Sequence, residues 1–288
     1  MKKLIIAALF FLTTPFFAQD VIIDLDENGD VIIFNARDNK QPLIELSYSA
    51  VQLNHEDFSN NDLIKQDGDL QLHLGYTVAT DTKIRKIYEE YLFLGYSSSS
   101  MSLSSSDGIY SFDVWKVGSN SRISYAIPIS SSVDFVPYYA GGMYFYSMGN
   151  SSESVAPIAG SPDETIINRT ADKKVHFGNT FESGVRFKFN NSISVYGGYS
   201  AYVFYPRFMT WKSLGSVIIY QVGLTLLDNF NRRIIKRSNV AGVLVDVILK
   251  SAYNYMIYSF QKGDMNWPIS TETPFTQEGF TVGFSFNF

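Results

Sequence analysis

The chain has 288 residues, a formal net charge of -5 and no cysteine, which excludes disulfides, a thiolate metal site and a lipid-carrying N-terminal cysteine. A mean hydropathy of -0.02 excludes a bundle of apolar membrane helices. It is compatible with a membrane β-barrel, because alternating strands average to neutral hydropathy. The acidic balance gives no reason to expect nucleic acid as a partner.

The N-terminus has the pattern of a secretory signal peptide. Lys2 and Lys3 precede an apolar run, Leu4 to Leu12, that is too short to span a bilayer. We expect cleavage near Ala18 or Gln19, so that residues 1–19 are the signal peptide. A retained N-terminal anchor is the alternative.

Residues 20–41 are predicted to form a periplasmic hairpin, because two apolar runs flank the turn signal Asn28-Gly29. Each arm is shorter than the roughly nine to eleven residues of a membrane strand. The same stretch matches the first half of a calcium-binding loop at Asp24, Asp26, Asn28 and Asp30. The twelfth position is Asn35 rather than Glu, so acidic hairpin arms are the favoured interpretation.

From Pro42 onward, segments that alternate apolar and polar residues predict strands with one apolar face. We expect an all-β, antiparallel transmembrane barrel over residues 42–288, with about ten strands and a range of roughly eight to twelve. The predicted strands are 43–54, 70–80, 86–103, 109–130, 133–148, 173–190, 193–206, 217–227, 251–261 and 279–288. In 109–130 the apolar positions change from even to odd numbers, which predicts a β-bulge near Gly118 and Ser119.

The segment before the last strand suits a helix over 231–249, followed by the upward strand 251–261 that the last, downward strand requires. A single long helix to Gln261 is the alternative. A transmembrane helix is not expected, because Asp246 and Lys250 interrupt the apolar run. The predicted helix gathers Arg232, Arg233, Lys236 and Arg237 on one face. This periplasmic basic face suits an acidic partner or anionic lipid headgroups, or it is simply solvated.

The final residues, GFTVGFSFNF, place alternate apolar side chains on one face, ending with Phe284, Phe286 and Phe288. The terminal Phe resembles the C-terminal sorting signal of bacterial outer-membrane β-barrels. With the signal peptide, this resemblance implies localisation in the outer membrane of a Gram-negative bacterium, contact with its lipids and assembly by the barrel-assembly machinery. It implies no activity.

The polar face of 173–190 contains His176, Glu182, Arg186 and Lys188. In so narrow a barrel we expect these side chains to pair rather than to line a channel. None of the three histidines sits in a compact arrangement with a serine, so no catalytic residue and no cofactor is predicted.

Three functions are compatible with the sequence. The first is a non-enzymatic structural or accessory component with outer-membrane or periplasmic protein partners, including a subunit of a larger secretion or assembly complex. The second is a narrow or gated small-solute channel. The third, with least support, is an outer-membrane lipid hydrolase.

Overall fold

The computed structural model describes residues 21–25, 31–35, 40–80, 85–104, 107–151, 154–155, 160–190, 192–235 and 238–288. Its main body is a closed, antiparallel barrel of eight strands. The barrel strands are β3 (Gln41–Asn54), β4 (Asp67–Ala79), β5 (Arg85–Ser98), β6 (Phe112–Pro128), β7 (Val133–Asn150), β8 (His176–Phe189), β9 (Ile193–Tyr205) and β10 (Phe275–Asn287). Because β10 pairs with both β9 and β3, the barrel has no free edge.

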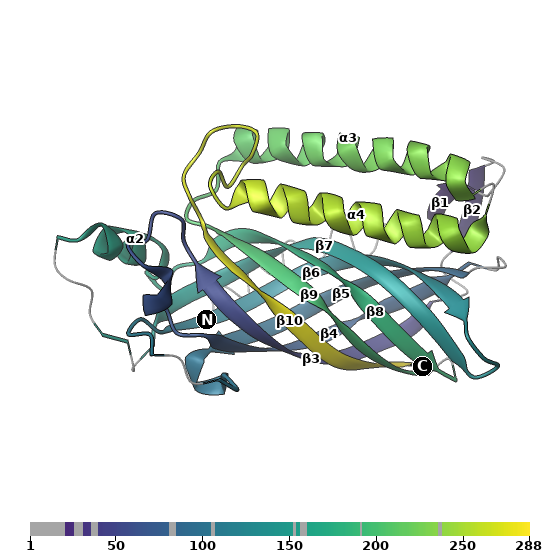
Figure 1. Ribbon diagram of the computed structural model, residues 1–288, viewed down its shortest axis with the longest axis horizontal. Coiled ribbons are helices and arrows are strands. Elements are labelled where there is room, and N and C mark those ends of the chain that lie inside the picture. Colours follow the sequence, from purple (N-terminus) through teal and green to yellow (C-terminus); the bar gives the residue numbers. More distant parts are fainter. Residues whose placement is uncertain are drawn as a thin grey trace.

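The two ends of the barrel differ (Figure 1). One end, the turn end, holds the tight connections 129–132 and 190–192 together with the C-terminus, where the Phe288 amide donates to the Pro42 carbonyl at 3.1 Å. The other, the loop end, holds longer connections with three short helices: η2 (Asn61–Leu63), η3 (Ser99–Met101) and α2 (Pro162–Thr170). The Ser161 hydroxyl caps α2 by accepting from the Glu164 amide.

Two long helices, α3 (Thr210–Ile235) and α4 (Asn239–Gln261), lie along the outside of the barrel between β9 and β10 in the chain (Figure 1). At about 1.5 Å per residue they extend about 39 and 35 Å. Val243 and Val247 of α4 pack on Tyr125 and Tyr139 of the barrel wall, and α3 packs mainly on α4. The segment Val240–Gln261 is long and apolar enough to cross a membrane, although it contains charged residues.

The predicted count of ten strands is wrong, because segments 217–227 and 251–261 belong to α3 and α4. Segment 217–227 is apolar at nearly every position, and such a run fits either periodicity. Helical structure before the last strand is confirmed, but the predicted bounds 231–249 are wrong, because they include the break between α3 and α4 and because α4 continues to Gln261. α3 runs from the loop end to the turn end and α4 runs back, so the chain returns to the loop end before β10 (Figure 1).

The predicted bulge in 109–130 is absent. Pairing between β5 and β6 keeps one register from Ser97↔Val114 to Arg85↔Ala126. Even-numbered residues of β6 therefore face the lumen throughout. The apolar residues Phe112 and Val114, which suggested a change of face, point inward and are fully buried.

The N-terminal segment contains a two-stranded antiparallel sheet, β1 (Val21–Leu25) and β2 (Val31–Asn35), and its periplasmic placement stays a prediction. Its turn, with Asp26, Asn28 and Asp30, lies outside the described residues, as does the side chain of Asp24. The calcium loop and the signal peptide 1–19 therefore stay predictions.

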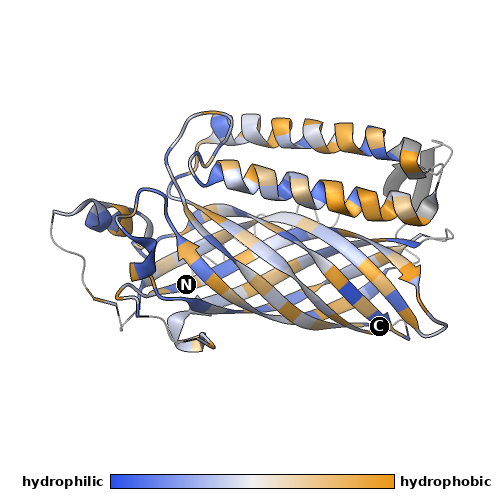
Figure 2. Cartoon of the chain, viewed as in Figure 1, coloured by the Kyte–Doolittle hydropathy of each residue, from blue (hydrophilic) through white to orange (hydrophobic). Residues whose placement is uncertain are grey.

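The barrel exterior is apolar, and Figure 2 shows hydrophobic residues across the strands and along both helices. Alternate strand positions expose large apolar side chains, among them Ile44, Leu46, Leu72, Leu74, Leu94, Val185, Phe187 and Val195. The last strand follows the predicted alternation: Phe280, Phe284 and Phe286 are exposed, whereas Thr281 and Ser285 are buried toward the lumen. This exterior has the pattern of a membrane-spanning barrel.

Replacing both Phe284 and Phe286 with Asp should prevent stable assembly. Each change puts a carboxylate on the apolar exterior of the strand that closes the barrel, which costs up to a few kcal/mol at that depth. The measurement is the amount of protein in the outer-membrane fraction that shows heat-dependent gel mobility. The double Leu variant is the control. Normal abundance of the Asp variant would contradict the prediction.

Candidate functional site

A buried network of charged side chains fills the lumen toward the turn end. Its centre is Arg122 of β6, which is fully buried. Its two terminal nitrogens donate to the two carboxylate oxygens of Glu45, each at 2.9 Å, and one of them also reaches Glu89 at 3.0 Å. The bidentate geometry matches the planar guanidinium to the carboxylate.

Aromatic rings enclose the Arg122 guanidinium. Its central carbon lies 4.8 Å from the ring centroids of both Tyr91 and Tyr138, and 5.4 Å from that of Tyr196. The faces of these rings attract the cation and replace part of its lost hydration. The Tyr196 hydroxyl, in turn, donates to Glu45 at 2.7 Å.

A second cation, Arg186 of β8, completes the network. It donates to Glu89 at 2.6 Å and to Glu45 at 2.9 Å, so both arginines share both carboxylates. Glu182 accepts from the Tyr138 hydroxyl at 2.7 Å and lies 3.5 Å from Arg122. Four barrel strands, β3, β5, β6 and β8, are thereby joined through charged side chains in the interior.

The residues of the predicted polar face of 173–190 lie in two different places. Glu182, Arg186 and Lys188 are buried and lie on the lumen face of β8, with the first two in the network. His176 lies apart from them at the loop end, where its Nε2 is 2.9 Å from Asp172. Burial opposes the charge on Asp172, but hydrogen bonds from Lys174 and His176 outweigh it and lower the Asp172 pKa to about 2.

Arg122, the best-connected member of the network, is not among the residues predicted for the lumen. Ile123 and Tyr125 occupy odd-numbered, apolar positions of the predicted strand 109–130, so the alternation indicates that Arg122 points inward. The reading of Gln221 as part of a barrel strand is wrong, because it lies on α3 outside the barrel.

A second polar group lies deeper in the lumen, toward the loop end. The Lys116 ammonium donates to Asp69 at 2.9 Å and to Gln277 at 3.0 Å, and it lies 4.1 Å from the Tyr202 ring centroid. Gln71 donates to the Tyr202 hydroxyl at 2.6 Å. These residues come from β4, β6, β9 and β10 and occupy the middle of the barrel.

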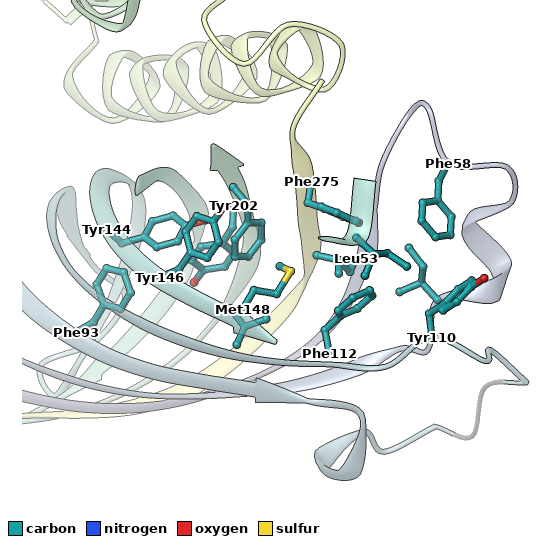
Figure 3. Packing of buried hydrophobic residues seen from close by; sticks show 14 residues of the cluster. Leu53, Phe58, Phe93, Tyr110, Phe112, Tyr144, Tyr146, Met148, Tyr202 and Phe275 are labelled. Atoms are coloured by element: carbon teal, nitrogen blue, oxygen red, sulfur yellow. The ribbon is translucent and has the colours of Figure 1, made fainter. Parts of the chain in front are cut away.

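An apolar plug closes the loop end of the lumen (Figure 3). Strand residues such as Leu53, Phe112 and Phe275 meet side chains from the connecting loops there. The full cluster is Leu53, Phe58, Ile64, Phe93, Tyr110, Phe112, Val114, Tyr144, Tyr146, Met148, Ile167, Tyr202, Phe204 and Phe275. The loops are thus folded into the mouth of the barrel, and Ser59 of one loop bonds Asp163 of α2.

The three histidines contact acids, amides and aromatic rings. His73 bonds Glu45 at 2.6 Å and Gln71 at 3.1 Å inside the lumen. His55 accepts from the Asp57 amide, lies edge-on to Phe275, and has a pKa lowered by burial, which Asp57 partly offsets. Within the described part of the chain, no serine hydroxyl is bonded to a histidine, and no group of three acidic or histidine side chains is placed to hold a metal.

A second charged cluster lies on the outer wall, between α4 and the barrel; we call it the wall cluster. Asp246 accepts from the Tyr125 hydroxyl at 2.8 Å, and Lys250 lies 3.0 Å from Asp246 and donates to the Tyr139 hydroxyl at 3.0 Å. Lys250 also pairs with Asp228 of α3. Charged residues of a helix at membrane depth face protein and pair in this way.

The predicted basic face cannot be placed in full. Arg232 and Arg233 belong to the last turns of α3, but their side chains and the residues Lys236 and Arg237 lie outside the described part of the chain. The connection between α3 and α4 is at the turn end.

In structure, the chain resembles two bacterial outer-membrane proteins. Neisserial surface protein A is 8% identical, with a TM-score of 0.38, over 86% of this chain and 97% of that chain. Ail, the attachment invasion locus protein of Yersinia pestis, is 7% identical, with a TM-score of 0.35, over 87% of this chain and 99% of that chain. These values carry no information on activity or partners. No protein-family model and no curated protein matches the sequence.

Replacing Glu89 with Ala should destabilise the barrel by about 3–5 kcal/mol, because it removes a buried carboxylate that two buried arginines share. The adjacent Glu90 is exposed on the other face of β5, so Glu90→Ala is the matched control. Urea unfolding of the barrel in detergent micelles measures the difference. Equal stabilities of the two variants would contradict the prediction.

Replacing Lys250 with Met should loosen the helices without opening the barrel, because it leaves Asp246 buried against the wall without its cation. Hydrogen exchange of α4 amides should become faster, while that of barrel amides should not change. The double variant Asp246→Asn/Lys250→Met, in which no unpaired charge is left between α4 and the wall, should recover part of the protection. Unchanged α4 exchange in the single variant would show that the wall cluster does not hold the helix.

Proposed function

We propose that this protein is a non-conducting, non-enzymatic β-barrel of a bacterial outer membrane that serves as a structural or accessory component. Its lumen is filled from the turn end to the loop end, and this observation carries the proposal. The role includes that of a subunit in a larger outer-membrane secretion or assembly complex.

The exterior supports placement in a membrane. Apolar side chains cover the strands, and the charged side chains of the wall cluster are turned toward protein. The wall strands pair without a free edge, as a barrel in hydrocarbon requires. The sorting-signal pattern that ends in Phe288 and the predicted signal peptide indicate the outer membrane as the destination.

The filled lumen argues against a channel. The interior of an eight-stranded barrel is barely wider than its own side chains. Here the Arg122 network, the Lys116 group and the apolar plug occupy successive levels of it. A solute would have to separate buried ion pairs and then displace an apolar cluster that includes parts of three loops.

A lipid hydrolase also lacks support. Nucleophilic catalysis of that type requires a serine activated by a histidine that a third group orients. His73 is buried in the lumen network, and His55 and His176 are held at the loop end by Asp57 and Asp172. None of these arrangements presents an activated hydroxyl.

The molecule instead offers two surfaces that suit an accessory role. At the loop end, Phe58, Tyr110 and Ile167 anchor the described parts of the connecting segments in the plug, so these parts form an ordered surface. Beside the barrel, α3 and α4 enlarge the membrane-embedded surface with exposed apolar side chains such as Ile218 and Leu226. Ordered loops lose little conformational entropy when they bind a partner.

Three measurements on one preparation test the proposal. The protein should appear in the outer-membrane fraction, give no discrete conductance steps in planar bilayers, and retain outer-membrane or periplasmic proteins after crosslinking and affinity purification in mild detergent. A porin reconstituted in the same way is the positive control for conductance. Reproducible single-channel steps from the wild-type protein would overturn the proposed role.

A further inference from the structure

A polar side chain stands in the middle of the lipid-facing surface of α3. Gln221 is within two residues of the midpoint of Thr210–Ile235, which places it about 2 Å from the centre of the helix. Its side chain is exposed, and its neighbours on the same face, Ile218 and Val222, are 54% and 55% exposed. The side-chain amide of Gln221 therefore faces the hydrocarbon region of the proposed membrane.

Three other polar side chains of α3 have partners within the chain. Ser213 donates to Asn266 at 2.8 Å, Ser216 donates to the Trp267 carbonyl at 2.7 Å, and Tyr220 donates to Asn254 at 2.9 Å. None of the described residues lies within hydrogen-bond distance of the Gln221 amide group, although its main-chain carbonyl accepts from Thr225. A polar group that meets lipid without a partner is unfavourable, so a partner outside this chain is expected.

The surface around Gln221 is an exposed face of a single helix. Val217, Ile218, Gln221, Val222, Thr225 and Leu226 form it, and all six side chains are exposed. The exposed residues Leu214, Ile218, Gln221 and Thr225 follow one another at spacings of four, three and four, as in the contact seam of two helices that cross at a small angle.

We propose that this face of α3 binds α3 of a second copy of the chain, with the two Gln221 amides hydrogen-bonded to each other. The inference rests on the proposed membrane placement. All copies insert in one orientation, so a two-fold axis along the membrane normal brings each residue against itself at equal depth. A primary amide is both donor and acceptor, so Gln221 is complementary to its own copy. Amide pairs of this kind join helices in membranes.

The absence of cysteine from the sequence allows a direct test with single-cysteine variants of the full-length protein. Ile218→Cys lies one turn from Gln221 on the proposed seam and keeps the amide. Leu72→Cys lies on an exposed outward position of β4, a strand that lies away from the helices. After oxidation in isolated outer membranes, Ile218→Cys should give a disulfide-linked dimer of the chain, and Leu72→Cys should not.

The amide is tested in the same background. Adding Gln221→Leu to Ile218→Cys should lower the dimer yield or raise the dissociation constant in detergent about tenfold, whereas adding Gln221→Asn should retain most of the dimer. Equal crosslinking of Ile218→Cys and Leu72→Cys, an unchanged yield with Gln221→Leu, or crosslinking only to a different protein would each overturn the inference. Absence of the chain from the outer-membrane fraction would instead refute the proposed function.

Discussion

The fold depends on the pairing of Arg122 with Glu45 at the centre of the barrel. Each charge alone would be costly to bury, and together with Glu89 and Arg186 they satisfy one another across four strands. These bonds form only when the strands have the correct neighbours and register, since a slip of one residue would turn Arg122 toward lipid. The network therefore favours the closed barrel in this register, and it fills the lumen toward the turn end.

The charged residues outside the barrel are also paired and buried, but on the other side of the wall. On the inner face, charges are hidden from lipid by the wall, and on the outer face Asp246 and Lys250 are hidden by the helix that carries them. Tyr125 and Tyr139 supply the wall side of that contact through their hydroxyls. Eight strands thus support a helical layer that meets the barrel through apolar packing and through the buried pair of Asp246 and Lys250.

Strands with one lipid face and one lumen face could be predicted from the sequence, because alternation of apolar and polar residues at every second position is typical of such strands. Eight of the ten predicted strands exist for this reason. Residues 217–227 could not be assigned, since an unbroken apolar run fits a lipid-exposed helix as well as a strand. The inward orientation of Phe112 and Val114 could not be predicted, because residues of the plug are as apolar as residues that face lipid. The alternation alone predicts that Arg122 faces the lumen, but it does not identify its partners on distant strands.

The position of α3 and α4 in the chain also constrains how the barrel is closed. They separate β9 from β10, so the strand that closes the barrel against β3 is synthesised after both helices. α3 begins and α4 ends at the loop end, and the end of α3 and the start of α4 lie at the turn end. The chain therefore leaves the wall after β9 and rejoins it at β10 at the same end of the barrel. The helical pair lies outside the closed wall, and Lys250 is buried between Asp228 and Asp246.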